Sequence, residues 1–323
     1  MTLQTTARIE RWPIAGAFVI SREALTEVSV VVAEVSDGAT TGRGECRPYS
    51  RYGETPESVR AAIAATPLEN ADREALRRIL PPGAARNALD CALWDFAAKR
   101  DRAPAWRSAG LAAPRPLTTA YTLSLGDPAP MAAAARRGGW PLLKLKLGGD
   151  GDPERIRAVR ESAPEARLIV DANEAWAARN FAENMRACAE AGVELVEQPL
   201  PADADDMLRD AERSVPVYAD ESLHVTADLE GLSGKYDGVN VKLDKAGGLT
   251  EAFELVRQAR RRGFGVMVGS MVCTSLAAAP AHLLAQQADI VDLDGPLLLQ
   301  RDREPGLRYS GALVEPPDPA LWG

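Results

Sequence analysis

Between residues 168 and 222 the chain contains three short apolar runs that each end in an acid: 168-LIVD-171, 194-ELVE-197 and 217-VYAD-220. The runs have the length of buried strands, and helix-like stretches lie between them. Similar runs occur on both sides at intervals of about 20–30 residues, the length of one strand–loop–helix–loop unit. We therefore predict eight strands, over residues 117–123, 142–147, 168–171, 194–197, 217–220, 238–242, 266–269 and 290–292.

Eight strands with helices between them favour a closed parallel barrel, an α/β fold of the modified TIM-barrel type (β/α)7β. The helices expected between the strands include residues 153–162, 178–191 and 250–262. An open doubly wound sheet is the alternative, but no G-x-G-x-x-G motif follows a first strand to support it.

The first hundred residues follow a different, α+β pattern. Residues 27–35 (EVSVVVAEV) are rich in β-branched side chains and precede the turn pair Asp37-Gly38, so we expect a strand entering a hairpin. Helices are expected after Thr55 and after Gly83. We expect three parts, which are an N-terminal α+β capping domain over 1–112, a catalytic barrel over 113–302, and a tail over 303–323 that packs back on the capping domain.

The composition excludes several classes of protein. The 323 residues carry a net charge of −8 and no polybasic run, so we expect no binding to nucleic acid. The four cysteines are widely spaced without a C-x-x-C pair, which predicts free, buried thiols in a reducing compartment. The uncharged stretch 263–288 contains glycine, proline, glutamine and histidine, so we expect a buried strand, loop and helix rather than a membrane span. With no signal peptide in the first residues, a cytoplasmic protein that contacts no membrane is expected.

Asp171, Glu197 and Asp220 end three consecutive predicted strands. In a parallel barrel these ends converge on one mouth, where three carboxylates would repel each other unless a cation neutralised them. Oxygen ligands favour a hard divalent ion, so we expect one Mg²⁺ per subunit, with Mn²⁺ as a substitute. Spacing alone leaves open that these acids are helix caps or solvated loop residues.

Lysines form the second part of the pattern. In LKLKL (143–147) the strand period of two places Lys144 and Lys146 on one face, and Lys242 lies on the sixth strand, across the barrel. A surface strand with a charged face is the alternative, but both faces of a parallel barrel strand are covered. A metal that holds a substrate carboxylate, with one base on each side of the adjacent carbon, would permit epimerisation or racemisation by 1,1-proton transfer.

Nine segments extend this pattern over almost the whole chain. They resemble the dipeptide epimerases of the enolase superfamily, most of all the L-Ala-D/L-Glu epimerases; that superfamily pairs a lysine or histidine base with Mg²⁺. The segments are GECRPYSRYGET (44–55), PPGAARNALDCALWD (81–95), LLKLKL (142–147), LIVDANEAW (168–176), ELVEQPLP (194–201), ADES (219–222), NVKLDKAGGLTEA (240–252), MVGSMVCTSLAAAPA (267–281) and DLDGP (292–296).

The resemblance implies a role for each matching residue. The metal ligands would be Asp171, Glu197 and Asp220, oriented by Asn173, Gln198 and Glu221. The two acid/base residues would be Lys146 and Lys242, while Lys144 would contact the substrate carboxylate and lower the pKa of Lys146. The substrate site would be lined by Thr122, Ser270 and Val272.

Recognition of the two ends of a dipeptide is implied in the same way. Asp292 and Asp294 resemble the pair that receives the ammonium group of the first residue, although a D-x-D pair in a capped loop is the alternative. Arg22, in the capping domain, would bind a second carboxylate such as that of glutamate. A plain surface arginine is the alternative there, and Tyr49, Arg51 and Tyr52 are further lid candidates.

The resemblance therefore implies an isomerase that interconverts L-Ala-L-Glu and L-Ala-D-Glu, or similar dipeptides, through a metal-stabilised enediolate. Its partner would be a small dipeptide from murein peptide recycling in the cytoplasm, and a homo-oligomer is compatible with the sequence. One alternative is a lyase or cycloisomerase on the same scaffold, of the o-succinylbenzoate synthase or muconate cycloisomerase type, whose substrates lack the ammonium group. Another is a barrel that binds a peptide without turning it over.

Overall fold

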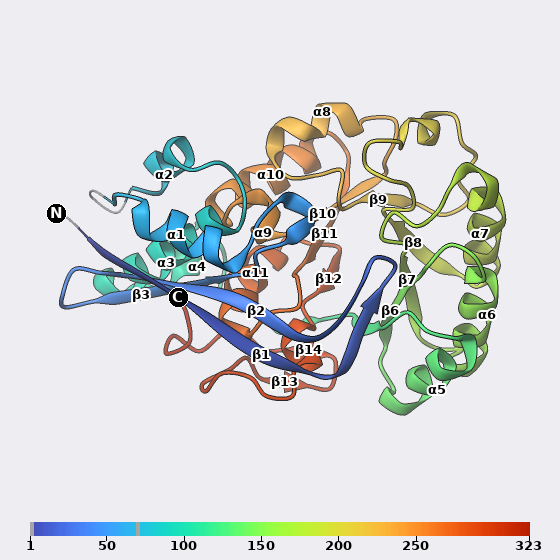
Figure 1. The fold of residues 1–323 in the computed structure, drawn as a ribbon, viewed down its shortest axis with the longest axis horizontal. Coiled ribbons are helices and arrows are strands. Elements are labelled where there is room, and N and C mark those ends of the chain that lie inside the picture. The colour runs from blue at the N-terminus through green and yellow to red at the C-terminus, as the bar shows by residue number, and fades with distance from the viewer. Residues whose placement is uncertain (1–2, 69–71) are drawn as a thin grey trace.

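The computed structural model describes residues 3–68 and 72–323. An eight-stranded parallel sheet curves into a barrel, and a three-stranded antiparallel sheet with its helices lies beside it (Figure 1). This arrangement confirms the predicted α/β barrel with an N-terminal α+β domain.

The barrel strands follow each other in the sheet in the same order as in the sequence. A hydrogen bond of 2.8 Å from Ala120 N to Val291 O brings the first and last strands together. The strands are β5 (Tyr121–Leu123), β6 (Leu142–Lys146), β7 (Arg167–Asp171), β8 (Val193–Glu197), β9 (Val217–Ala219), β10 (Gly238–Val241), β11 (Gly265–Gly269) and β12 (Ile290–Asp292).

Side chains alternate along these strands, so they face either the surrounding helices or the inside of the barrel. One face of β6 turns Leu143 and Leu145 outward, into the core that the surrounding helices share. The other face turns Leu142 inward, where it joins a small buried apolar cluster that forms a floor beneath the lysines of the same strand. The other members of this floor are Ala120, Ile169, Leu195, Met267 and Ile290.

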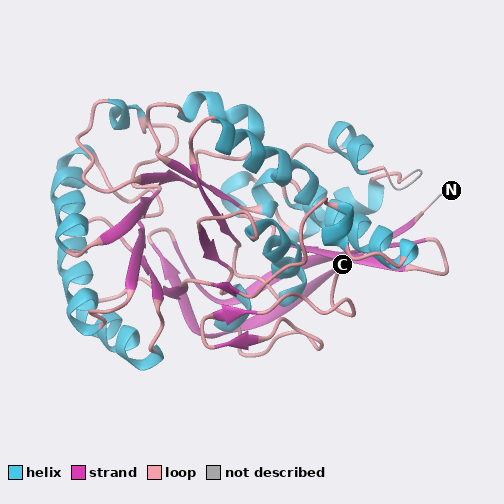
Figure 2. Ribbon diagram, turned by 180° about the vertical axis from the view of Figure 1, so that it is seen from behind, coloured by secondary structure: helices cyan, strands magenta, loops and turns pink. Residues whose placement is uncertain are grey.

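Helices cover the outside of the barrel (Figure 2). Three of them begin and end within one residue of the predicted bounds: α6 (Asp152–Ser162), α7 (Ala178–Glu190) and α10 (Leu249–Arg261). The uncharged stretch forms β11 and the buried helix α11 (Ser275–Ala285), as expected. The remaining barrel helices are α5 (Pro128–Gly138), α8 (Leu229–Leu232) and α9 (Leu243–Ala246), with 3₁₀ turns η3 (Thr226–Asp228) and η4 (Gly295–Leu298).

Two local expectations are wrong. The predicted strand 117–123 is divided into β5 and a separate strand β4 (Leu117–Thr118), which pairs with β14 (Leu313–Val314) and not with the barrel. Thr119 N bonds Ala312 O while Ala120 N bonds Val291 O, so the chain crosses from one sheet to the other at this point. The β14 strand also pairs with β13 (Tyr309–Ser310).

The second departure lies between β8 and β9. In residues 198–216, all of which are described, a 3₁₀ turn, η2 (Asp206–Arg209), stands where the repeating pattern predicts an α-helix. Pro199, Pro201 and Pro216 lie in this connection, and proline lacks the N–H group that a helix interior needs.

The N-terminal domain is built on a long antiparallel hairpin. The strand predicted over 27–35 lies within β2 (Glu23–Ser36), and β3 (Thr41–Cys46) follows it after the Asp37-Gly38 turn. The sequence pattern did not predict β1 (Gln4–Ile20), whose first half carries charged side chains on an exposed edge. The helices are α1 (Pro56–Ala65), α2 (Arg73–Ile79), α3 (Ala84–Asp101) and α4 (Ala105–Ser108), with the turn η1 (Ser50–Tyr52).

The tip of the β1–β2 hairpin reaches across to the barrel (Figure 1). Leu125 N, in the loop after β5, donates a 2.9 Å hydrogen bond to Val19 O. Ser21 Oγ donates a 2.9 Å bond to Asn173 O, in the loop after β7. The hairpin therefore lies over the ends of the first and third barrel strands.

Tight packing joins β3 to α3. A Cβ atom added at Gly44 would lie 2.1 Å from Ala88 O, and one added at Gly42 would lie 2.2 Å from Ala92 O. Only glycine permits this approach of a strand backbone to a helix backbone.

The chain beyond β12 returns to the N-terminal domain. Arg303 contacts Glu45 of β3 at 2.6 Å, and Trp322 Nε1 donates a 3.0 Å bond to Cys91 O in α3. All four cysteines are buried and free, as expected. Within the described ranges, no helix is both long and apolar enough to cross a membrane.

Candidate active site

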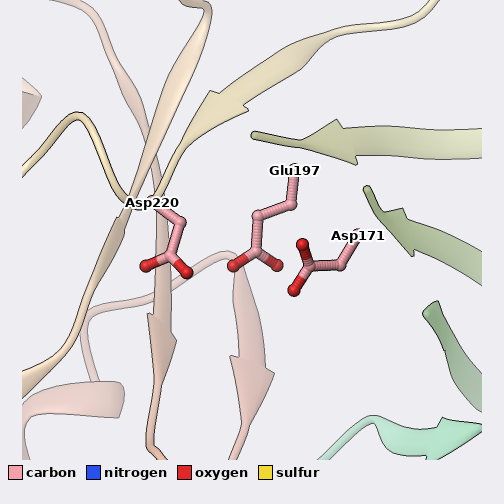
Figure 3. Close-up of side chains that lie close together, drawn as sticks. All are labelled: Asp171, Glu197 and Asp220. Carbon is pink, nitrogen blue, oxygen red and sulfur yellow. The ribbon is translucent and has the colours of Figure 1, made fainter. Parts of the chain in front are cut away.

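Asp171, Glu197 and Asp220 meet at the mouth of the barrel (Figure 3). Asp171 and Glu197 are the last residues of β7 and β8, paired in register, and Asp220 directly follows β9. Each offers one oxygen atom, and these atoms all lie within 4.8 Å of one another. All three side chains are buried, so strand geometry brings together the acids that the sequence pattern selected.

This donor set fits a divalent cation. Burial raises the pKa of Glu197 to about 7, and the charges of Asp171 and Asp220 add to the effect. Glu197 Oε2 is buried and lies 2.6 Å from Lys144 Nζ, in an orientation that makes no hydrogen bond. Three crowded carboxylates with an unsatisfied oxygen are the hard ligands that Mg²⁺ prefers.

Lys144 and Lys146 approach this cluster from β6. Lys146 pairs in register with Asp171, and its Nζ lies 2.6 Å from Asp171 Oδ2. Lys144 Nζ lies 3.2 Å from the same oxygen and 2.8 Å from Asp292 Oδ2. Both lysines are buried, so the surface-strand alternative is wrong.

Lys242 approaches from the other side. It directly follows β10, the sixth barrel strand, and its Nζ lies 2.7 Å from Asp220 Oδ2 and 4.0 Å from Glu197 Oε1. Lys144, Lys146 and Lys242 line one cavity. Three strands, β7, β8 and β9, separate the two lysine-bearing strands in the sheet.

The carboxylates control the charge of Lys144 and Lys242. Burial alone would lower the pKa of Lys144, but Asp292, Glu197 and Asp171 outweigh it and hold that pKa well above its usual value. At Lys242 burial also lowers the pKa, but Asp220 and Glu197 outweigh it and hold the pKa above its usual value. A divalent ion on the carboxylates would offset this negative charge and favour the neutral amine that a base requires.

Asp292 and Asp294 stand beside the lysines at the end of β12. Asp292 Oδ1 is buried without a hydrogen-bond partner, while Asp294 Oδ2 accepts a 2.6 Å bond from Thr122 N. Burial, together with the charge of Asp292, raises the pKa of Asp294 to about 7. Both aspartates line the cavity with Thr122, Ser270 and Val272, so the structure brings together the whole predicted substrate-lining set.

The predicted orienting residues lie close to the acids in different ways. Asn173 N donates a 2.9 Å bond to Asp171 Oδ1, and Gln198 Oε1 accepts a 2.9 Å bond from Asp220 N. Both have left-handed backbones, with φ of 44° at Asn173 and 35° at Gln198. Such conformations in non-glycine residues concentrate at functional sites. Glu221 instead contacts Arg22.

Arg22 lies at the tip of the β1–β2 hairpin, where the N-terminal domain meets the barrel. Its guanidinium lies 2.5 Å from Glu221 Oε1, donates a 2.9 Å bond to Asn173 O, and donates a 3.0 Å bond to the Tyr49 hydroxyl. Arg22, Tyr49 and Tyr52 line the cavity that the lysines share. Arg51 pairs instead with Glu174 outside it. Arg22 therefore lines the cavity while part of it stays exposed, and its contact with a substrate carboxylate stays a prediction.

Two residues whose side chains contact the three acids were not predicted from the sequence. Asn240 Nδ2 donates a 2.7 Å bond to Glu197 Oε1, and Lys245 Nζ lies 2.5 Å from Asp220 Oδ1. The period of two that places Asn240 on the same face as Lys242 was available as a signal. For Lys245 the only signal is its place three residues after Lys242.

Comparison with known proteins identifies the family. Residues 129–319 match the family described as enolase C-terminal domain-like, and residues 2–110 match the mandelate racemase / muconate lactonizing enzyme N-terminal domain. The chain belongs to the enolase superfamily.

Similar members of the superfamily are epimerases and racemases, which are isomerases. The L-Ala-D/L-Glu epimerase of Escherichia coli (strain K12) is 46% identical over 93% of this chain and 96% of its own. The N-acetyl-D-glutamate racemase of Pseudoalteromonas sp is 41% identical over 91% of this chain and 95% of its own.

Solved structures of superfamily members agree. An Agrobacterium tumefaciens enolase family member with homology to dipeptide epimerases, bound to sodium and L-Ala-L-Glu, has a TM-score of 0.97 and 49% identity, covering 99% of this chain and 100% of its own. The dipeptide epimerase of Cytophaga hutchinsonii, complexed with Mg and D-Ala-L-Val, has a TM-score of 0.91 and 26% identity, covering 98% and 94%.

Proposed function

We propose that this protein is a Mg²⁺-dependent dipeptide epimerase that interconverts L-Ala-L-Glu and L-Ala-D-Glu, or similar dipeptides. One observation carries the proposal: Lys146 and Lys242 reach a single buried cavity from strands on opposite sides of three carboxylates. Two amines in such positions can act on both faces of one carbon, and a binding protein would have no use for them.

The chemistry follows from what each group can do. When held by Asp171, Glu197 and Asp220, the divalent ion would stabilise the negative charge that develops on the substrate carboxylate. Lys144 would donate to the same carboxylate. One of Lys146 and Lys242 would remove the proton from the α-carbon, and the other would return a proton to the opposite face of the planar enediolate. Asn173 and Gln198 would keep the acids in place through their contacts with Asp171 and Asp220.

The ends of the dipeptide would be recognised by opposite charges. Asp292 and Asp294 would receive the ammonium group, beside Thr122, Ser270 and Val272. Arg22 would bind the side-chain carboxylate of the second residue. For this purpose residues 1–112 would act as a lid over a barrel formed by 113–302, with 303–323 packed on the lid.

Two other activities provide the alternatives. A lyase or cycloisomerase of this scaffold acts on substrates without an ammonium group, so the buried, partnerless Oδ1 of Asp292 argues against it. The similarity to an N-acetyl-D-glutamate racemase favours racemisation of an N-acylated glutamate as the second candidate. We place the dipeptide reaction in the cytoplasm, in the recycling of murein peptides, with Mn²⁺ able to replace Mg²⁺; the free cysteines support a reducing compartment.

Exchange of the α-proton for deuterium, followed by NMR in heavy water with Mg²⁺, tests the proposal. The wild-type protein should exchange the glutamate α-proton of both L-Ala-L-Glu and L-Ala-D-Glu and interconvert them. Lys242→Ala should lower epimerisation by about 10³-fold or more while one stereoisomer still exchanges through Lys146. Lys146→Ala should still exchange the α-proton of the other stereoisomer, through Lys242. Full epimerisation by Lys242→Ala would exclude the two-base mechanism.

A further inference from the structure

Lys245 is a buried lysine for which the proposed mechanism has no use. It lies in the single-turn helix α9, which begins directly after Lys242. Its side chain is 1% exposed, and its Nζ donates to Asp220 Oδ1 at 2.5 Å, to Asp220 O, and to Asn240 O at 3.2 Å. An ammonium group has three N–H donors, so none is left for a substrate.

The opposite side of the same helical turn is held by the N-terminal domain. Asp244 Oδ1 accepts a 2.7 Å bond from Asn87 Nδ2 and a 3.1 Å bond from Arg47 N. Arg86 donates to Ala246 O at 2.6 Å and to Gly247 O at 3.0 Å. The α9 turn is therefore fixed from the lid on one side and from Asp220 on the other.

Lys242 and Lys245 each contact a different oxygen of the Asp220 carboxylate. Lys245 holds Oδ1, and Lys242 Nζ lies 2.7 Å from Oδ2. Because Lys245 also binds the main-chain oxygen of Asp220, it fixes both the backbone and the side chain of that residue. Loss of Lys245 would therefore free one oxygen of this carboxylate and the main-chain oxygen of the same residue.

We propose that Lys245 is a positioning residue, which ties the candidate metal ligand Asp220 to the turn that carries Lys242. The inference rests on the proposed function for the role of Lys242, and on geometry alone for the hold on Asp220. Its consequence is that loss of Lys245 disturbs one metal ligand and one of the two bases, while Lys146 on the far strand keeps its place.

Lys245→Met is the variant that tests this role, because methionine retains an unbranched side chain without the ammonium group. Lys99→Met is the matched control, since Lys99 pairs with Asp95 in α3, away from the site. The first readout is the dissociation constant for Mn²⁺ alone, measured by electron paramagnetic resonance without substrate. We expect Lys245→Met to weaken Mn²⁺ binding by about tenfold or more, as losses around ligating residues do, and Lys99→Met to leave it unchanged.

The second readout is the ratio of α-proton exchange rates of the two stereoisomers at saturating Mn²⁺. Lys245→Met should slow the isomer that depends on Lys242 at least about tenfold more than the isomer that depends on Lys146. Unchanged Mn²⁺ affinity, or an equal loss for both isomers, would overturn the proposal. If the wild-type protein exchanges no dipeptide, the proposed function fails, and the Mn²⁺ comparison still decides whether Lys245 holds Asp220.

Circular dichroism establishes whether each variant folds. Lys245→Gln, whose amide retains two donors, provides a milder variant if the methionine chain does not fold. Lys245→Gln should also weaken Mn²⁺ binding and slow the isomer that depends on Lys242 more than the other. Both effects should be smaller than those of Lys245→Met. A Lys245→Gln protein with wild-type values in both assays would contradict the role.

Discussion

At the scale of single residues, the site shows why some positions can be found in a sequence and others cannot. Asp171 and Glu197 end regular strands, so counting residues in each run was enough to place them on one mouth. Lys245 belongs to a turn, where no period tells which way a side chain points. The partner of Arg22, Glu221, is 199 residues away, and only the folded hairpin brings the two together.

Asp294 is one of the two aspartates that receive the ammonium group in our proposal. Asp294→Asn keeps the shape and removes the charge, so kcat/KM for L-Ala-L-Glu should fall by about 100-fold, since losing one partner of a buried charge pair costs about 2–5 kcal/mol. Steady-state epimerisation measured by polarimetry checks this. Asp289→Asn, at a surface pair with Arg260, should leave kcat/KM within about twofold.

A different result for Asp294→Asn would point to the alternatives. If the variant retained wild-type kcat/KM on dipeptides, the D-x-D pair would have no part in binding the ammonium group. If the wild-type protein preferred N-acetyl-glutamate, which has no ammonium group, racemisation of N-acylated glutamate would replace dipeptide epimerisation as the proposed function.

At the scale of elements, strands that alternate regularly could be predicted, and those that change partners could not. The period of two along β6 placed its lysines correctly because both faces of a barrel strand are covered. The run 117–123 looks equally regular, yet Thr119 and Ala120 bond to different sheets and divide it. The long β1 was missed because its exposed charged side chains obscure the apolar pattern of its far end.

Gly44 provides a test of the packing between β3 and α3. In Gly44→Ala the new methyl group would meet Ala88 O and Ala92 N, both backbone atoms, which cannot move aside without shifting the helix. Overpacking of this kind costs about 1–3 kcal/mol, so the midpoint of urea unfolding should fall accordingly.

Gly231→Ala is the matched control for that substitution. Gly231 lies in α8, and a Cβ atom there would meet nothing within 4 Å. Alanine is the better helix former, so stability should stay the same or rise by up to about 1 kcal/mol. Equal stability of the Gly44→Ala and Gly231→Ala proteins would show that β3 does not depend on this close approach.

At the scale of the whole molecule, one buried histidine makes stability depend on pH. His282 in α11 is fully buried against β14; its Nε2 lies 3.3 Å from Val314 O, and its Nδ1 has no partner. Burial lowers the pKa of His282 to about 4. The unfolded chain has the ordinary value of about 6.5. The contribution of neutral His282 to the free energy of unfolding is therefore fully present above the unfolded pKa. It is lost as the pH falls below that value and through the folded pKa.

Urea unfolding of His282→Gln against the wild-type protein isolates this contribution. Between about pH 7.5 and about pH 5, the wild-type free energy of unfolding should fall by roughly 2 kcal/mol more than that of the variant. All other titrating groups are common to both proteins and cancel in the difference. Identical pH dependence would mean that folding leaves the pKa of His282 at its unfolded value. His224→Gln, at a half-buried position, should show a smaller difference.

Trp322 covers the helix α3 through a bond to Cys91 O, although 231 positions separate the two residues along the chain. During translation, α3 leaves the ribosome long before the indole that shields it has been synthesised. The barrel strands therefore leave the ribosome, and can assemble, while this part of α3 is still uncovered. The covering of α3 by Trp322 is therefore completed only after all the barrel strands have been synthesised.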